Sequence, residues 1–313
     1  MTPRPFLIDT DTGVDDALAL MLALRSQEIS VKAITTVAGN VEVMKCTRNV
    51  QTLIRLLQLK NPPQVAQGAR KPLTRKLFMA PEVHGKDGLG NTQGPVRKNH
   101  KHIRGDAVSV IIECCRRYGK QLTIVALGPL TNIALAWRKN PGALRKIRRI
   151  VTMGGAFDVR GNTGPVAEFN YYVDPEAAQI ILDSGLPITM IPLDLTEQVV
   201  AMRIEWEERA KRSAGRLAKF ILQMTNTYML YHKKTEGFYG AYLHDPVAVA
   251  AAIDPTLVKS RKSYVEVDTN GFLTRGMTTA AVRKRAGRLP FVDIATSMNR
   301  ELFLRRLYSC LWS

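Results

Sequence analysis

The sequence predicts an α/β fold, a single Rossmann-like domain with a largely parallel central sheet flanked by helices, plus a small hairpin. Three observations support this prediction. Short β-rich runs alternate with helical patterns along most of the chain. The run Leu122–Leu127 is continuously apolar, as expected for a strand buried on both faces. Several runs end in polar or glycine-rich loops that lead into a helix, which is where such sheets place their sites.

Length and composition favour one large core, and we expect one domain, residues 1–313, with 45% hydrophobic residues. No apolar run reaches transmembrane length, and the chain enters a strand too early for a signal peptide, so we expect a cytoplasmic protein without membrane contact. The 45 Lys and Arg against 27 Asp and Glu give a net charge of +18, which could attract nucleic acid. Because the basic residues form short, dispersed clusters, we expect no nucleic-acid binding, with weak RNA binding as the alternative.

The first element is an apolar strand, Pro5–Ile8, followed by the motif DTDTGVDD, Asp9–Asp16. Four carboxylates within eight residues repel one another, so the motif predicts a bound cation, most simply a hard divalent metal. Gly13 permits a tight turn into a helix that begins near Asp15. The alternative is that Asp15 and Asp16 only cap this helix, although capping requires one acid rather than four.

The next strand, Val31–Val37, ends close to Asn40, which would be a second polar group at the same edge of the sheet. A helix and a short strand around Val65 follow. The segment Gly68–Arg104 has little periodicity, and a loop of that length is more often functional than idle. It contains His84 in a glycine-rich stretch, although a lone histidine is more commonly a structural or surface residue.

A helix capped by Asp106 precedes the buried strand Leu122–Leu127, whose terminal carbonyl groups can face the acidic motif. Strands at Ile150–Met153 and Ile188–Ile191 repeat the arrangement. Between them, the polar loop Asn162–Asn170 shows no capping or ion-pair pattern that would explain it. The chain therefore offers polar groups at several strand ends.

The last third begins with a mostly helical region, Arg203 to about Tyr231, and the aromatic residues of Tyr228–Tyr242 either stack on a planar ligand or simply pack. His244 and Asp245 then precede an apolar helix. Finally, Tyr264–Thr269 and Phe272–Met277 flank Asn270-Gly271, which predicts a hairpin as an appendage to the domain.

These motifs, taken in order, resemble the inosine-uridine type nucleoside hydrolases, which cleave the N-glycosidic bond of ribonucleosides to ribose and free base. The resemblance covers almost the whole chain. Its fragments are DTDTGVDD, ITTVAGN, VHGKDGLG, ALGPLTNIALA, MGG, AEFN with DPEAA, LHDP and the hairpin from VEV to LTRGM. Each fragment alone carries little information, but their order is highly specific.

The resemblance implies a Ca²⁺ site of hard oxygen ligands at the strand ends, completed by water and substrate oxygens. The residues at the family's ligand positions are Asp11, Asp16, the backbone carbonyl of Leu127, and Asp245. Those at its ribose-binding positions are Asp15, Asn40, Asn162, Glu168 and Asn170, with Met153 beside the sugar. His84 and His244 match the pair near the base. A homodimer or homotetramer is implied as well.

The implied reaction needs an activated water and a ribose drawn toward an oxocarbenium ion. Asp11 would be the general base, and His244, expected to titrate near neutral pH, would be the acid for the leaving base. Direct displacement by water predicts inversion at the anomeric carbon. The family commonly has proline after this aspartate, and Thr12 stands there instead, which leaves the loop less rigid.

Two other classes of function stay open from the sequence. Asp9 and Asp11, two apart after an apolar strand, resemble the nucleophile loop of haloacid-dehalogenase-like phosphatases, but Gly13 stands where that loop needs threonine. A noncatalytic nucleoside- or RNA-binding protein could instead use the basic surface. The preferred base would depend on Gly68–Arg104 and Tyr228–Tyr242.

Overall fold

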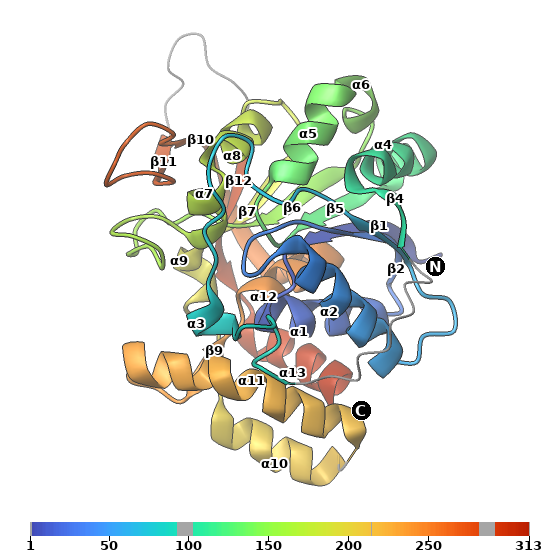
Figure 1. Cartoon of the computed structure of the whole chain (residues 1–313), viewed down its shortest axis with the longest axis vertical. Coiled ribbons are helices and arrows are strands. Elements are labelled where there is room, and N and C mark those ends of the chain that lie inside the picture. The colour runs from blue at the N-terminus through green and yellow to red at the C-terminus, as the bar shows by residue number, and fades with distance from the viewer. Residues whose placement is uncertain (1, 93–102, 214, 282–291, 313) are drawn as a thin grey trace.

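The computed structural model describes residues 2–92, 103–213, 215–281 and 292–312, and a ten-stranded sheet lies at its centre (Figure 1). The strands are ordered β11-β10-β12-β7-β6-β5-β1-β2-β3-β4. Their bounds are β1 Arg4–Thr10, β2 Ile29–Thr36, β3 Gln64–Gln67, β4 Ile103–Asp106, β5 Thr123–Ala126, β6 Arg149–Met153, β7 Ile188–Ile191, β10 Val258–Val267, β11 Thr278–Ala281 and β12 Val292–Met298. Neighbours from β12 to β4 are parallel, which confirms the predicted fold class.

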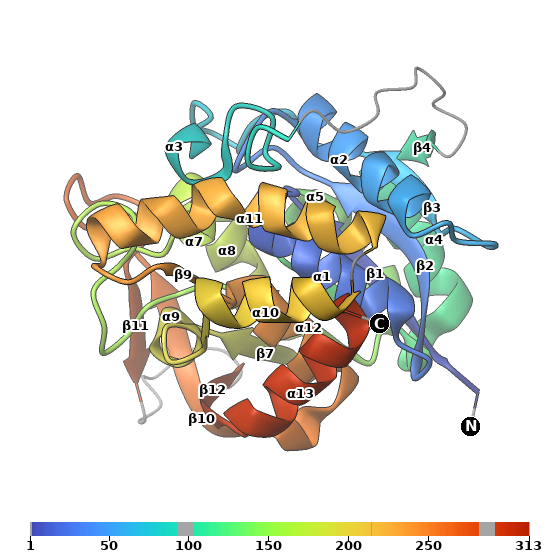
Figure 2. The same ribbon diagram turned by 90° about the horizontal axis from the view of Figure 1, so that it is seen from below.

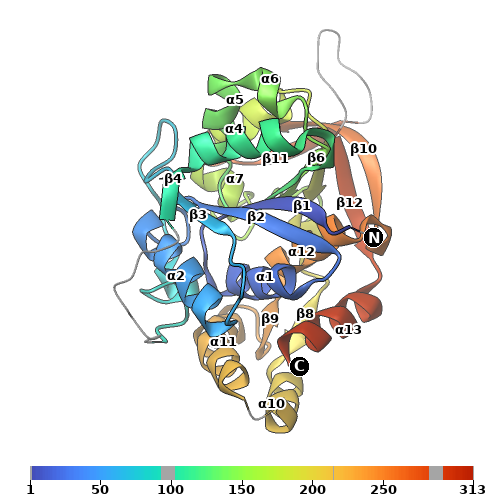
Figure 3. The same ribbon diagram turned by 90° about the vertical axis from the view of Figure 1, so that its right-hand side faces the viewer.

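Helices cover both faces of the sheet (Figures 1 and 3). One face carries α4 Ala107–Tyr118, α5 Thr131–Lys139, α6 Pro141–Leu144 and α8 Pro175–Leu182. The other carries α1 Val14–Arg25, α2 Val43–Leu56, α12 His244–Ile253 and α13 Arg300–Leu311. On that side, α10 Arg203–Ser213 and α11 Arg216–Thr235 form an outer layer, seen in front of α1 and α12 in Figure 2. None of the helices in the described ranges is both long and apolar enough to cross a membrane.

The alternation of side chains along β1 explains the two cores. Phe6 and Ile8 pack with the cluster that includes α1 and α12, whereas Leu7 packs with the cluster that includes α4 and α5. All three are fully buried. Full burial of a side chain of this size contributes about 1.5–3 kcal/mol, so the strand is fixed from both sides.

The acidic motif lies where the strand order reverses. From β1 the chain proceeds outward through β2, β3 and β4, while from β5 it proceeds in the opposite direction through β6 and β7. The two central strands stay together at their ends, where the Leu127 N–H donates to the carbonyl of Asp9 at 2.8 Å. The connections after β1 and β5 then diverge, which opens a crevice at the carboxyl ends of these strands.

The hairpin differs in detail from the sequence prediction. Its first strand, β10, also pairs with β12, so the hairpin extends the main sheet rather than forming an appendage. The second strand is Thr278–Ala281 and not Phe272–Met277, and Phe272 is 97% exposed in the connecting loop. The reason is the Asp268 carboxylate, which accepts hydrogen bonds from the N–H groups of Asn270 and Gly271 and organises a wider loop than a two-residue turn.

The remaining small elements frame the cavity described below. They are the short helices α3 Pro81–His84, α7 Phe169–Val173 and α9 Leu193–Thr196, and an antiparallel pair, β8 Val200–Met202 and β9 Gly240–Tyr242. The first helix begins at Val14, one residue before the predicted start. The loop predicted over residues 68–104 contains α3 and the first residues of β4, and its residues 93–102 lie outside the described part.

Candidate active site

Acidic side chains from the N-terminal region and from the last third of the chain meet at the carboxyl ends of the central strands. Asp15 and Asp16 lie in the first turn of α1, and Asp245 lies in the first turn of α12, which packs against α1. One carboxylate oxygen of each lies within 4.8 Å of the other two, and all three side chains are buried. At the opposite end of α12, a guanidinium N–H of Arg149 donates to the Ala252 carbonyl at 3.0 Å, which anchors the helix.

Local hydrogen bonds orient the acids of the N-terminal motif. Asp16 Oδ2 accepts hydrogen bonds from the Gly13 N–H at 2.8 Å and from the Asn40 side-chain amide at 3.1 Å. Asp16 therefore caps α1, as the alternative hypothesis stated, and it also belongs to the acidic cluster. Asp11 Oδ2 accepts from the Asn40 backbone N–H at 2.7 Å. The second oxygen, Asp11 Oδ1, is buried and has no hydrogen-bond partner among the described residues.

The electrostatics of the cluster follow from burial and mutual repulsion. Burial raises the pKa of Asp15 to about 8, with the charge of Asp16 as the next cause. Burial and then the charge of Asp16 hold the pKa of Asp11 well above its ordinary value. Burial and the charge of Asp15 do the same for the pKa of Asp245. A nearby divalent cation removes this penalty, and buried carboxylate oxygens, one of them unpartnered, are the donors that a hard cation prefers.

Residues expected to bind the cation and a residue expected to bind the ribose lie side by side in this cluster. The three grouped acids include Asp15, which was assigned to the ribose, whereas Asp11 adjoins Asp16. The Leu127 carbonyl, also an expected ligand, accepts a hydrogen bond from the Asn170 amide at 2.8 Å, which leaves its second lone pair.

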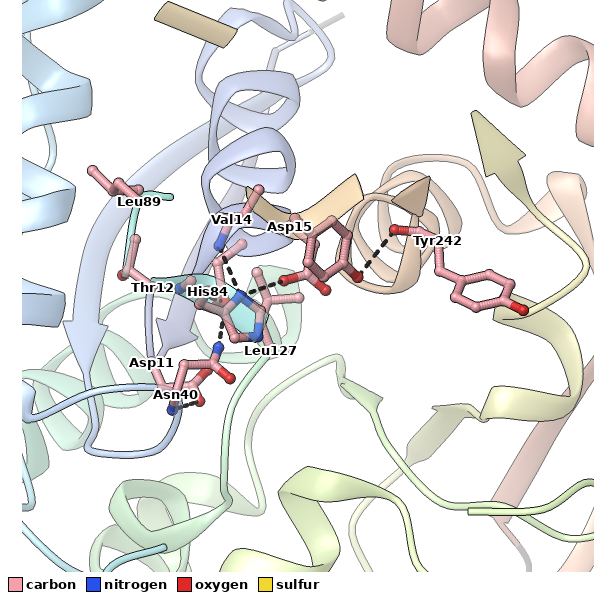
Figure 4. Close-up of polar contacts among 12 residues, drawn as sticks. Asp11, Thr12, Val14, Asp15, Asn40, His84, Leu89, Leu127 and Tyr242 are labelled. Carbon is pink, nitrogen blue, oxygen red and sulfur yellow. Dashed lines mark hydrogen bonds and ion pairs between the residues drawn. The ribbon is translucent and has the colours of Figure 1, made fainter. Parts of the chain in front are cut away.

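A cavity of about 700 Å³ opens above the acids, a size typical of small-molecule sites. The predicted site residues that line it are Asp15, Asn40, His84, Leu127, Met153, Asn162, Glu168, Asn170, His244 and Asp245. Asp11 and Asp16 lie beneath this lining, and their side chains are almost completely buried. Figure 4 shows Asp11, Asn40, Asp15 and His84 gathered beside the first turn of α1.

One side of the cavity is built from the loop before α7. Glu168 caps this helix, its Oε1 accepts from the Asn170 N–H at 2.8 Å, and burial raises its pKa to about 7. The Asn170 amide also donates to the Met153 carbonyl at 3.2 Å, which joins this loop to the end of β6. Asn162 is exposed at the rim, where its side-chain oxygen accepts from the Phe169 N–H at 2.9 Å.

The opposite side carries the two predicted histidines. His84 Nδ1 accepts from the Val14 N–H at 3.1 Å and lies 3.9 Å from an Asp15 oxygen. Burial lowers the pKa of His84 to about 3, so the ring is neutral and its contact with Asp15 is not an ion pair. Burial likewise lowers the pKa of His244 to about 3, well below the near-neutral titration expected from the sequence.

Aromatic rings connect these histidines along the cavity wall. Tyr228 stacks on His84 with ring centroids 5.5 Å apart, and His232 meets Tyr228 edge-on at 4.5 Å. His232 Nδ1 lies 3.1 Å from the Gly240 carbonyl. Tyr242 contacts both His232 and His244. The rings therefore pack on one another, and they also line the cavity, where a planar ligand would reach them.

Sequence reasoning missed two polar contacts of the site residues. The Cys46 thiol donates to the backbone carbonyl of Asp11 at 2.9 Å, which fixes the loop after β1 from α2. Thr196 Oγ1 lies 2.7 Å from His244 Nδ1. Neither residue stands in a recognisable motif, so only their place in the fold reveals them.

The doubly wound sheet, the buried acids at its switch point and the imidazole-lined cavity above them define a metal-dependent enzyme of the α/β class. The family model described as inosine-uridine preferring nucleoside hydrolase matches residues 6–305, and the chain belongs to this family of enzymes, which hydrolyse N-glycosidic bonds.

Relatives of known name agree with this assignment. The chain is 40% identical to the pyrimidine-specific ribonucleoside hydrolase RihA of Enterobacter sp. (strain 638) over 96% of its length and 95% of the relative's. Identity to RihA of Escherichia coli (strain K12) is also 40%, over 96% of both chains. Among solved structures, a purine-preferring ribonucleoside hydrolase from Gardnerella vaginalis is similar, with a TM-score of 0.91, 35% identity and 98% coverage of both chains. The plant nucleoside hydrolase PpNRh1 gives a TM-score of 0.91 and 35% identity, with 99% of both chains covered.

Proposed function

We propose that this protein is a Ca²⁺-dependent hydrolase of purine and/or pyrimidine ribonucleosides that releases ribose and the free base. The observation that carries the proposal is the convergence of Asp245 with Asp15 and Asp16 beneath a cavity that His84 and His244 line. Relatives named for pyrimidine and for purine nucleosides support the reaction class and leave the base preference to be measured.

The proposed ligands of the cation are Asp11, Asp16, the backbone carbonyl of Leu127, and Asp245. Their hard oxygen atoms suit Ca²⁺, and the unpartnered Oδ1 of Asp11 supports its inclusion. When bound, the cation would lower the pKa of a coordinated water and gather the diol oxygens of the ribose.

Asp11 is the proposed general base. Its burial and the charge of Asp16 favour the protonated carboxyl group, which is the form reached after it takes the proton of the attacking water. The water oxygen then bonds to the anomeric carbon as the C–N bond breaks, and the electron pair of that bond goes to the base. Attack from the face opposite the base predicts inversion at the anomeric carbon.

The ribose would be held by Asp15, Asn40, Asn162, Glu168 and Asn170, with Met153 beside it. The charge that develops on the sugar ring is positive, so carboxylate and amide oxygens around it stabilise the transition state more than the ground state. Glu168 supports this role, because backbone N–H groups hold its carboxylate in place at the cavity wall.

His244 is the proposed acid for the leaving base, with His84 beside it. Because the buried His244 ring is neutral, it would act as a hydrogen-bond donor to the base while negative charge develops there. The departing base takes a proton from solvent, and Asp11 returns to solvent the proton it took from the attacking water, so ribose and free base together account for the consumed water.

A nucleoside panel tests the proposal. Purified protein is incubated with uridine, cytidine, inosine and adenosine, with and without a calcium chelator, and reducing sugar is measured. We expect ribose release that the chelator abolishes. Phosphate release from p-nitrophenyl phosphate without ribose formation would favour the hypothesis of a phosphatase. Salt-dependent RNA binding without sugar product would favour the hypothesis of a noncatalytic binding protein.

We also propose, as expected from the sequence, a single domain over residues 1–313 and a cytoplasmic location, and, on the family resemblance, a homodimer or homotetramer in solution. Light scattering coupled to gel filtration would measure the oligomeric state.

A further inference from the structure

Thr196 is the polar partner of His244 on the side away from the cavity. It is the last residue of α9, which packs against α12, and its side chain is fully buried. Its hydroxyl oxygen lies 2.7 Å from His244 Nδ1. Within the described part of the chain, this is the one hydrogen bond recorded for the hydroxyl. His244 lines the cavity and Thr196 does not, so Nε2 is the ring nitrogen left for a ligand.

The direction of this hydrogen bond follows from what a buried hydroxyl requires. If Thr196 accepted a hydrogen bond from Nδ1–H, its own O–H would have no acceptor among its described neighbours, which is unfavourable in a buried site. If Thr196 donates to Nδ1, the hydroxyl is satisfied. Nδ1 is then an acceptor, and the proton of the neutral ring resides on Nε2.

The other two cavity histidines show how a fixed partner selects the ring tautomer. The Val14 N–H can only donate, so His84 Nδ1 is an acceptor and Nε2 carries the proton. The Gly240 carbonyl can only accept, so the neutral His232 ring carries its proton on Nδ1. Thr196 acts on His244 as the Val14 N–H acts on His84.

We propose that Thr196 is a positioning residue that holds His244 in the Nε2–H tautomer and so presents a hydrogen-bond donor to the departing base. This inference rests on the proposed nucleoside hydrolysis. A carbonyl group in place of the hydroxyl would select the opposite tautomer, which offers the base a lone pair and repels its developing negative charge. No covalent step passes through Thr196.

The test compares two leaving groups. Thr196→Val keeps the shape of the side chain and removes the donor, so kcat for the best nucleoside substrate should fall about 10- to 100-fold with little change in KM. p-Nitrophenyl β-D-ribofuranoside carries a leaving group that is stable as an anion, so its kcat should change by less than about threefold. Thr196→Ser restores the donor and should recover most of the nucleoside activity.

Thr225→Val is the matched control. Thr225 is also fully buried, but its hydroxyl donates to the Ile221 carbonyl within α11 at 2.7 Å. For Thr225→Val, the ratio of kcat on the nucleoside to kcat on the p-nitrophenyl riboside should equal the wild-type ratio. Equal losses on both substrates for Thr196→Val, or an unchanged nucleoside kcat, would overturn the inference.

A second measurement separates this inference from the proposed function. ¹⁵N NMR of histidine-labelled wild-type protein should show His244 with a protonated Nε2 and an acceptor Nδ1, and Thr196→Val should lose that bias. An Nδ1–H tautomer in the wild type would overturn the role of Thr196 whatever the substrate. Absence of nucleoside cleavage together with the expected tautomer would instead count against the proposed function.

Discussion

The backbone N–H of Asn40 donates a 2.7 Å hydrogen bond to Oδ2 of Asp11, which joins the loops that follow two neighbouring parallel strands. The Asn40 side chain meanwhile donates to Asp16. One residue after β2 therefore orients two acids after β1, and Asp11 Oδ1 is left without a hydrogen-bond partner among the described residues.

Asp11→Asn tests the general base. The amide oxygen can still accept from the Asn40 N–H, so the loop geometry should persist while the base is lost. We expect kcat for nucleosides to fall about 10²- to 10⁴-fold, measured by reducing-sugar release. Asp183→Asn, at an exposed position after α8, is the matched control and should leave kcat unchanged. An Asp11→Asn variant with wild-type turnover would remove Asp11 from its proposed role.

Gly39→Ala tests the close approach of the backbone to the same acid. A Cβ at Gly39 would lie 2.1 Å from Asp11 Oδ2, so the carboxylate must move. Because displacement of a reacting group by about 1 Å costs roughly 100-fold, kcat/KM should fall by at least that order. Gly142→Ala in α6, where the nearest atom is 3.8 Å away, should leave activity unchanged. Similar kinetics for the two variants would show that Asp11 tolerates the shift.

Removal of the cation should affect both activity and stability. The buried acids repel one another, so a chelator should abolish turnover and lower the melting temperature, and added Ca²⁺ should restore both. Mg²⁺ should restore less, because it requires a more regular octahedral site. Thermal unfolding followed with and without chelator measures this effect, and full activity in excess chelator would contradict calcium dependence.

His232 should make the fold sensitive to acid. Burial lowers the pKa of His232 from 6.5 to about 4, so above pH 6.5 the ring is neutral in both the folded and unfolded states. Between pH 6.5 and 4 the unfolded chain binds a proton that the folded chain does not, and the free energy of unfolding decreases as pH falls. His232→Phe removes this titration. The melting temperature of the wild type minus that of the variant should therefore decrease as pH falls from 6.5 to 4. A value that stays constant over this range would refute the assignment.

Much of the fold could be predicted because local patterns and tertiary packing agree. The run Leu122–Leu127 is buried on both faces as its sequence indicates, and Asp106 caps α4 as predicted. The hairpin loop was misplaced because the Asp268 side chain, rather than Asn270-Gly271, sets the turn. Such competition between a side chain and a dipeptide preference cannot be read from spacing alone.

The candidate site was predictable only in part. The acids of the N-terminal motif are close in sequence, but Asp245 was connected to them through the family resemblance, and its approach depends on how α12 packs on α1. Thr196 and Cys46 carry no sequence signal, since each acts through one contact to a residue distant in the chain. The lowered pKa of His244 likewise follows from burial, which residue identity does not specify.

Helix α12 begins with His244 and Asp245, so a single element supplies both a histidine of the cavity lining and a carboxylate of the acidic cluster. Under the proposed function, a shift of that helix would change the contact to the base and the affinity for the cation together. Tyr228 and His232 belong to α11, and neither is among the grouped acids. Under the proposed function, substitutions on α11 would change the cavity lining near the base without removing a proposed ligand of the cation, whereas equivalent changes on α12 would affect both properties together.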